Sequence, residues 1–140
     1  MQKKYKIGYT TGVFDLFHVG HLNILRRAKE MCETLIVGVS TDDVCVSRKN
    51  HKPVICQEDR CAIVAAIRYV DRVVLQEDMD KLSAVKKYGA DAVFVGSDWK
   101  GTPTWNEYEK EFNNVGCEVV YLDHTDGISS TIIREKLNEE

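Results

Sequence analysis

The residues best suited to chemistry lie together in one short segment near the start of the chain. Residues 9–21 read YTTGVFDLFHVGH and hold one aspartate, Asp15, and two histidines, His18 and His21. A buried strand is expected just before this segment and a helix just after it. A strand-to-helix loop offers unpaired backbone N–H groups and the positive end of a helix dipole, and both favour anions. The segment therefore predicts a phosphate site in which both imidazoles can face the bound anion.

Two glycines and the apolar spacing that follows refine this prediction. Gly12 and Gly20 lack a Cβ, so a ligand can come close to the backbone at either position. The helix is expected to begin near Val19 or Gly20 and to run to about Met31, because apolar residues recur at helical spacing. These residues are Leu22, Leu25, Ala28 and Cys32.

Length and composition narrow the class of protein. The chain has 140 residues, 44% hydrophobic and 29% charged, which predicts one globular domain over residues 1–140. A formal charge of −3 argues against general nucleic-acid binding, which needs a basic surface. No apolar run approaches a membrane span and no signal peptide is recognised, so we expect a cytoplasmic protein. The five cysteines include no C-x-x-C pair, which argues against a disulfide framework or a zinc site.

Strand-like and helix-like segments alternate along the whole chain. Strands are expected at residues 6–10, 34–39, 72–75, 91–95 and 117–122. A helix is expected after about residue 58, with one apolar face formed by Ile63, Ala66, Ile67 and Val70. Further helices are expected from Asp78 or Asp80 to Tyr88, over residues 105–114, and from Ser129 or Ser130 to Leu137. The segment Ser40–Gln57 is expected to be irregular. This order predicts an α/β fold, a single doubly wound five-stranded parallel sheet of the Rossmann-like type with helices on both faces.

Ligands of such sheets bind beyond the carboxyl ends of the strands, where the strand order reverses. The loops after the first, second, fourth and fifth expected strands all end at that edge. Those loops carry nearly every candidate residue named in this section, so one site is expected to gather them.

Four motifs resemble one family. His18-Val19-Gly20-His21 is an H-x-G-H sequence and follows G-V-F-D-L-F, residues 12–17. Arg68–Val73 is similar to R-Y-V-D-E-V, Gly96–Trp99 to G-D-D-W, and His124–Thr131 to R-T-E-G-I-S-T-T. In order and spacing the chain resembles the small bacterial glycerol-3-phosphate cytidylyltransferases of the H-x-G-H family, over essentially its whole length.

The resemblance implies an activity and its partners. It implies transfer of a cytidylyl group from CTP to a small phosphorylated alcohol, with glycerol 3-phosphate as the best candidate acceptor and pyrophosphate as the leaving group. It implies Mg²⁺ arriving with CTP, a homodimer, a nucleotidyltransferase-type fold and a product used in cell-surface polysaccharide biosynthesis. No nucleic acid or membrane insertion is expected.

The resemblance also assigns catalytic residues. His18 and His21 are implied to donate hydrogen bonds to the phosphate oxygens, where charge develops in the transition state. Lys52, directly before Pro53, best matches the phosphate-binding lysine of the family, ahead of Arg48 and Lys49. Arg60 matches the arginine of an E-x-R segment.

Further residues are assigned to the two substrates. Acceptor contacts are implied for Asp15, Arg68 and His124, although a structural salt bridge is an alternative for Arg68. Asp15 can help to hold Mg²⁺ or orient a histidine, or it can satisfy backbone amides of the loop. For Trp99, packing at the rim is an alternative to nucleotide binding. Nucleotide contacts are implied for Thr11, Gly12, Val13, Phe14, Asp15, Gly20, Gly96, Asp98, Trp99, Thr125, Gly127, Ile128, Ser129, Ser130 and Thr131.

Three departures from the family pattern leave alternatives open. His124 stands in place of an arginine, Ser97 in place of an aspartate, and Val13 where the glycerol-phosphate enzymes often have threonine. The acceptor could therefore be phosphocholine, phosphoethanolamine or another phosphorylated molecule. An ATP-using adenylyltransferase and a nucleotide-binding module without turnover are the rival functions.

Overall fold

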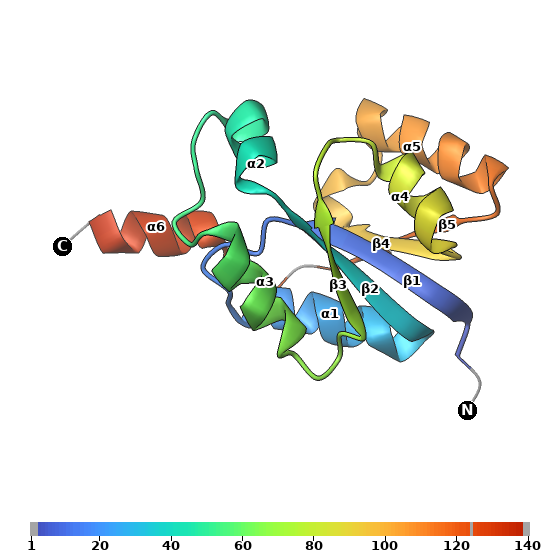
Figure 1. Cartoon of the computed structure of the whole chain (residues 1–140), viewed down its shortest axis with the longest axis horizontal. Coiled ribbons are helices and arrows are strands. Elements are labelled where there is room, and N and C mark those ends of the chain that lie inside the picture. Colours follow the sequence, from blue (N-terminus) through green and yellow to red (C-terminus); the bar gives the residue numbers. More distant parts are fainter. Residues whose placement is uncertain (1–2, 124, 139–140) are drawn as a thin grey trace.

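Five parallel strands form one sheet at the centre of the molecule (Figure 1). The computed structural model describes residues 3–123 and 125–138, without the side chains of residues 48 and 49. The strands are β1 (Tyr5–Gly12), β2 (Cys32–Ser40), β3 (Arg72–Gln76), β4 (Ala92–Gly96) and β5 (Glu118–Leu122), in the spatial order β3-β2-β1-β4-β5. All four pairings are parallel, which confirms the predicted doubly wound α/β fold.

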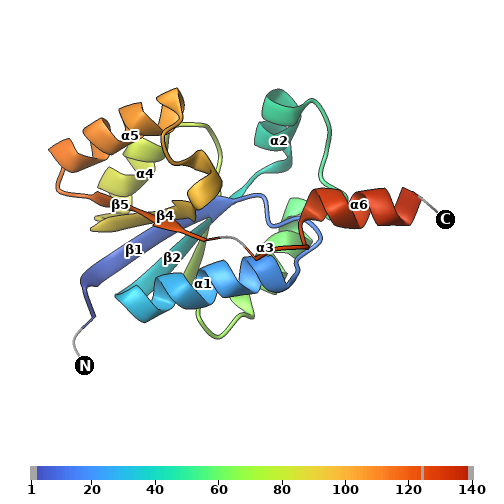
Figure 2. The same ribbon diagram turned by 180° about the vertical axis from the view of Figure 1, so that it is seen from behind.

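Helices cover both faces of the sheet (Figures 1 and 2). On one face lie α1 (Val19–Met31) and α3 (Gln57–Ala65), and on the other lie α4 (Lys81–Tyr88) and α5 (Pro103–Asn114). Two further helices, α2 (Asp42–Lys49) and α6 (Ser130–Asn138), lie beyond the carboxyl ends of the strands. Among the described residues, no helix is long and apolar enough to cross a membrane.

The core consists of two clusters, one on each face of the sheet. In β2, Leu35, Val37 and Val39 pack in the cluster beneath α1 and α3, whereas Ile36 packs beneath α4 and α5. All four side chains are buried. A central strand that is buried on both faces needs apolar residues at every position, which explains the nearly continuous apolar run that predicted this strand.

The prediction of an irregular segment over residues 40–57 is wrong, because the segment contains α2. The Thr41 hydroxyl accepts a hydrogen bond from the backbone N–H of Val44 at 3.2 Å and so caps the helix. Two aspartates in the first turn interact favourably with the positive end of the helix dipole. The polar composition of the segment masked a short helix in which Val44 and Cys45 are the buried residues among positions 42–47.

The apolar face predicted for α3 is also partly wrong. The helix ends at Ala65, and its buried residues are Arg60 and Val64, whereas Ile63 is 38% exposed. Ile67 and Val70 pack against the core from the turns that follow the helix. The expected ends of α4 are confirmed, since Asp80 caps the helix and Gly89 ends it in the left-handed conformation. The helix α5 begins at Pro103, two residues before the expected start, with Thr102 as its cap.

Candidate active site

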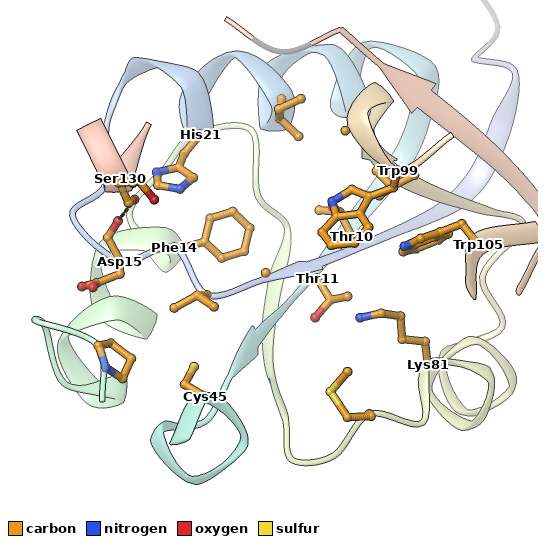
Figure 3. Close-up of a pocket in the computed structure, with 18 of the residues that line it drawn as sticks. Thr10, Thr11, Phe14, Asp15, His21, Cys45, Lys81, Trp99, Trp105 and Ser130 are labelled. Atoms are coloured by element: carbon orange, nitrogen blue, oxygen red, sulfur yellow. Dashed lines mark hydrogen bonds between the residues drawn. The ribbon is translucent and has the colours of Figure 1, made fainter. Parts of the chain in front are cut away.

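A cavity of about 580 Å³ lies at the carboxyl edge of the sheet, where β1 and β4 are neighbours (Figure 3). The connections after these two strands leave in opposite directions, which opens a crevice between them. We call one part of the cavity the phosphate end, formed by Asp15, His21, Ser130, Thr131 and Arg134. The aromatic end is formed by Met79, Lys81, Trp99, Trp105 and Tyr108. Thr10 and Thr11 lie between the two ends (Figure 3), and Gly12 also lines the cavity.

The two histidines cap the first turn of α1. The Nδ1 atom of His18 accepts a hydrogen bond from the backbone N–H of Gly20 at 3.0 Å. The Nδ1 atom of His21 accepts one from the backbone N–H of His18 at 3.2 Å. The two rings stack with their centroids 3.9 Å apart. The sequence predicted the pair and its place at the helix start, and the structure adds that each ring closes one half of a reciprocal cap.

These two hydrogen bonds fix the tautomer of both rings. A nitrogen that accepts a hydrogen bond from a backbone amide carries no proton, so Nδ1 is unprotonated in His18 and in His21. A neutral imidazole then has its proton on Nε2 and can donate it to an oxygen of a ligand. The start of α1 therefore has two imidazole N–H donors, and neither ring carries a positive charge.

Burial keeps both rings neutral. Burial, together with the smaller effect of the neighbouring His18, lowers the pKa of His21 to about 4 against the opposing effect of the Asp15 carboxylate. Burial also lowers the pKa of His18. At neutral pH the pair is therefore uncharged.

The lowered pKa values predict how stability depends on pH. Between about pH 6.5 and pH 4 the unfolded chain binds a proton at His21 and the folded chain does not, and the lowered pKa of His18 acts in the same direction. The free energy of unfolding should therefore fall as the pH is lowered through this window. The pKa values of Asp71 and Asp80 are also lowered in the folded chain, but these carboxylates reduce the free energy of unfolding only at lower pH, where carboxylates take up protons. Urea titrations across the window would measure this. In His21→Asn the slope should become shallower, and an unchanged slope would contradict the assignment.

Gly20 is required by the His18 ring. A Cβ at Gly20 would lie 2.8 Å from Cε1 and 2.9 Å from Nδ1 of His18, which is too close for a side chain. The sequence predicted that this glycine lets a ligand approach the backbone. The structure corrects that reason, because the atoms that occupy the space belong to the capping imidazole.

The loop between β1 and α1 is held in an unusual backbone conformation. Phe14 and Leu16 have φ values of 56° and 51°, in the left-handed region that residues other than glycine rarely adopt. The Phe14 side chain is buried, and its ring lies beside those of Phe17 and His21. Core packing therefore maintains the strain in the loop that carries Asp15.

The contacts of Asp15 match one of the roles predicted for it. Its side chain is 4% exposed and accepts hydrogen bonds from the backbone N–H groups of Val54, at 2.8 Å, and Ile55, at 2.9 Å. The guanidinium of Arg134 lies 3.6 Å from the same carboxylate. Asp15 therefore satisfies loop amides, as one reading of the sequence expected, and joins three segments at the phosphate end.

The donor set does not fit a magnesium ion held by the protein alone. Both carboxylate oxygens of Asp15 already accept backbone N–H groups. Among residues 3–123 and 125–138, no group of three or more His, Cys, Asp or Glu side chains could hold a metal.

The start of α6 completes the phosphate end. Gly127 has a φ of +81°, so the turn before the helix needs a glycine. Ser129 caps the helix by accepting from the N–H of Ile132 at 3.1 Å, and Ser130 donates to the carbonyl of Asp15. Ser130 and Thr131 line the cavity, as the sequence predicted. Ile128 packs near Gly20, and Thr125 accepts a hydrogen bond from Asn23, so these two predicted nucleotide contacts lie beside the cavity.

Arg60, predicted to be catalytic, lies beneath the site. Its side chain is fully buried and does not line the cavity. The guanidinium donates to the carbonyls of Ile55, Val13 and Ser40 at 2.7–2.9 Å and pairs with Asp42 at 2.6 Å. The structure therefore corrects this prediction, and Arg60 is a positioning residue that ties the loops after β1 and β2 together.

Two predicted cations lie away from the cavity. Lys52 is exposed and does not line it, although its neighbour Pro53 does. Arg68 lies in the turn before β3, at the amino edge of the sheet, and donates to the Tyr69 hydroxyl at 3.0 Å. The structure thus contradicts an acceptor contact by Arg68 within its own chain. His124 lies outside the described residues.

The predicted nucleotide contacts after β1 and β4 are largely brought together. Thr11, Gly12, Val13 and Phe14 line the cavity, and so do Gly96 and Trp99. Asp98 belongs to the short 3₁₀ turn Ser97–Trp99 but does not line the cavity. Trp99 lines the cavity and is 44% exposed, so it is partly accessible to solvent.

Several lining residues were missed by the sequence reasoning. Arg134 and Lys81 carry positive charge into the cavity, and Trp105 and Tyr108 form its aromatic wall. Helical spacing could have revealed Arg134, because it follows Ser130 by one turn and shares its face. Lys81 follows the cap of α4 and no motif marks it, so only the fold places it.

The chain is similar to known proteins along most of its length. Residues 9–136 match the protein family described as Cytidylyltransferase-like. Proteins named glycerol-3-phosphate cytidylyltransferase from Bacillus spizizenii and Staphylococcus aureus are each 40% identical to it over 129 residues. These alignments cover 91% of this chain and 94% and 92% of the relatives. An FAD synthase from Archaeoglobus fulgidus is 36% identical over 80% of each chain.

A solved structure has a similar fold. The crystal structure of the lipopolysaccharide core biosynthesis protein from Thermoplasma volcanium matches with a TM-score of 0.76 and 26% sequence identity. The match covers 87% of this chain and 99% of that one.

Proposed function

The chain belongs to the cytidylyltransferase-like family, and we propose that it transfers the cytidylyl group of CTP to glycerol 3-phosphate, releasing pyrophosphate. The observation that carries this proposal is the phosphate end of the cavity. There the neutral imidazole of His21, with its proton on Nε2, lines the cavity together with Arg134 and the start of α6, and the His18 ring stacks on it without lining the cavity. Three sources of hydrogen-bond donors thus converge where a triphosphate would bind.

The chemistry needs no base from the protein. A phosphate monoester is mostly a dianion at neutral pH, since its second pKa is about 6. One of its oxygens attacks the α-phosphorus in line, the new P–O bond forms, and the bond to the bridging oxygen breaks. Pyrophosphate leaves with that electron pair. The Nε2–H groups donate to the α-phosphate oxygens as negative charge builds up there, a role that suits neutral imidazoles.

The remaining parts of the proposal concern partners and setting. Mg²⁺ enters as part of the substrate, bound to the triphosphate oxygens, which are the ligands it prefers. The enzyme works as a cytoplasmic homodimer, and its product is used for cell-surface polysaccharide. The fold neighbour named as a lipopolysaccharide core biosynthesis protein supports this last part.

Trp99 is proposed to stack against the cytosine. Its ring lies at the rim of the cavity and is partly exposed, whereas Trp105 is buried. Stacking on an aromatic side chain contributes about 1–3 kcal/mol per base. Trp99→Ala should therefore raise the KM for CTP about tenfold and change the acceptor KM little, as initial-rate kinetics would show. An unchanged KM for CTP would contradict the role.

Pyrophosphate release tests the proposed function. Purified protein with Mg²⁺ is given CTP or ATP, each with and without glycerol 3-phosphate. We expect release with CTP only when the acceptor is present. Release with ATP but not CTP would instead support the adenylyltransferase alternative, and CTP binding without release in any mixture would support a module without turnover.

A further inference from the structure

A buried tyrosine and a buried glutamine form a hydrogen bond within the sheet. Tyr9 in β1 is 1% exposed, and Gln76 at the end of β3 is 5% exposed. The Tyr9 hydroxyl donates to the Oε1 atom of Gln76 at 2.5 Å. Burial raises the pKa of Tyr9, so the hydroxyl keeps its proton at neutral pH. The Tyr9 ring packs in the apolar cluster beneath α4 and α5, where a directed polar contact of this kind calls for an explanation.

The strand between the two residues makes room for their bond. In the sheet, β2 separates β1 from β3, so the Tyr9 side chain must reach across a strand to meet Gln76. The Tyr9 hydroxyl occupies the space beside Gly38 of β2. A Cβ at Gly38 would lie 2.0 Å from this oxygen and 2.8 Å from the Cζ atom of Tyr9. The glycine that interrupts the apolar run of β2 therefore serves the bond between Tyr9 and Gln76.

Gln76 also holds the segment that follows β3. Residues 77–80, which we call the connection, join β3 to α4, and all four are exposed. With no buried side chain of its own, the connection depends on hydrogen bonds for its position. The Nε2 atom of Gln76 donates to the carbonyl of Asp78 at 2.9 Å. From another side, the Tyr108 hydroxyl donates to the carbonyl of Met79 at 3.2 Å.

The connection contributes to the wall of the cavity. Met79 lines the cavity, and so does Lys81, which follows the connection in the first turn of α4. The next step rests on the proposed function. CTP uses the phosphate end and Trp99, which other segments supply, so the groups that the connection places are left for the acceptor. A misplacement of about 1 Å at such contacts can lower a rate about 10²-fold.

We propose that Tyr9 and Gln76 are positioning residues of the reaction, which hold the connection where acceptor binding requires it. Neither side chain lines the cavity, so the pair acts through the carbonyl of Asp78 and not by touching a substrate. The stability of the sheet does not require the pair. Two apolar side chains of similar shape would fill the same space at little cost, because no polar group would be left unpaired.

Initial rates with single variants measure the effect on each substrate. Gln76→Met removes the hydrogen bonds of the amide and should raise the KM for glycerol 3-phosphate about tenfold. The KM for CTP should change less than about twofold, since the phosphate end and Trp99 are untouched. Tyr9→Phe should raise the acceptor KM less, about threefold, because Gln76 can still donate to the carbonyl of Asp78.

The double variant Tyr9→Phe/Gln76→Met distinguishes positioning from stability. Each single variant leaves one buried polar group unpaired, whereas the double variant removes both. Its free energy of unfolding in urea should therefore be close to the wild-type value and above that of Gln76→Met. Its acceptor KM should stay as high as in Gln76→Met. An acceptor KM that returns to the wild-type value together with the stability would overturn the proposal.

Tyr5 provides the matched control. Its hydroxyl donates to Glu118 at the amino edge of the sheet, and its side chain is buried like that of Tyr9. Tyr5→Phe should lower the free energy of unfolding and leave the KM for both substrates at the wild-type values. A raised acceptor KM in this control would overturn the proposal, because any loss of stability would then produce the effect.

Hydrogen exchange followed by mass spectrometry tests the positioning without turnover. The amides of residues 77–81 should exchange faster in Gln76→Met and in the double variant than in the wild type, and at the wild-type rate in Tyr5→Phe. This result supports the pair even if the wild type releases no pyrophosphate, which would overturn the proposed function alone. Equal exchange in Gln76→Met and the wild type would overturn the role of the pair.

Discussion

Replacing His21 with alanine should lower kcat by about 10²–10³-fold, because the transition state loses a preorganised Nε2–H donor. The KM for CTP should rise much less, since the oxygens gain most of their charge during the reaction. The effect on stability should be smaller, about 1 kcal/mol, from the lost hydrogen bond between Nδ1 and the His18 N–H. Steady-state kinetics and urea unfolding would measure the two effects separately.

A matched variant separates the donor from the cap. In His21→Asn the side-chain oxygen can still accept from the backbone N–H of His18, but nothing replaces the distant Nε2–H. We expect the asparagine variant to be nearly as stable as the wild type and as slow as the alanine variant. If it turned over at the wild-type rate, His21 would be only a helix cap.

Replacing Arg60 with methionine should produce the largest loss of stability, about 3–5 kcal/mol. The buried guanidinium satisfies the carbonyls of Val13, Ser40 and Ile55 and neutralises Asp42. Methionine leaves three carbonyl oxygens and a carboxylate without these donors. Lysine should not rescue the protein, because one ammonium group cannot reproduce the fork of donors. The free energy of unfolding in urea is the measurement.

Arg26 provides the control for this prediction. It pairs with Glu30 at 4.0 Å on the exposed face of α1, where both side chains are largely exposed. Arg26→Met should change the free energy of unfolding by less than about 1 kcal/mol. If Arg60→Met cost no more than Arg26→Met, the account of Arg60 as the residue that joins the two loops would be wrong.

The sequence predicted the sheet and most helices because strong, regular signals produce them. The apolar run of β2 and the Asp80 and Gly89 caps are local patterns that the tertiary fold does not overrule. The prediction failed at α2, because Val44 and Cys45, the buried residues among positions 42–47, are too few to give a periodic pattern. It failed on the face of α3 because a buried arginine, rather than an apolar residue, marks the inner side.

The same contrast holds at the site. His18, His21 and the start of α6 lie within motifs, so sequence order was enough to bring them together. Arg60 also lies within a motif, yet whether its guanidinium faces substrate or three backbone carbonyls is decided by loops distant in sequence. Lys81 and Thr11 line the same cavity only because β1 and the connection after β3 end at the same edge of the sheet.

The most direct test of the central claim is to identify the product. CTP, Mg²⁺ and glycerol 3-phosphate are incubated with the protein and followed by ³¹P NMR. We predict the signals of CDP-glycerol, in which one diphosphate joins cytidine to glycerol, appearing in step with pyrophosphate and in equal amount. CMP formed together with pyrophosphate would show hydrolysis rather than transfer. CTP that remains intact with glycerol 3-phosphate present would contradict the proposed reaction.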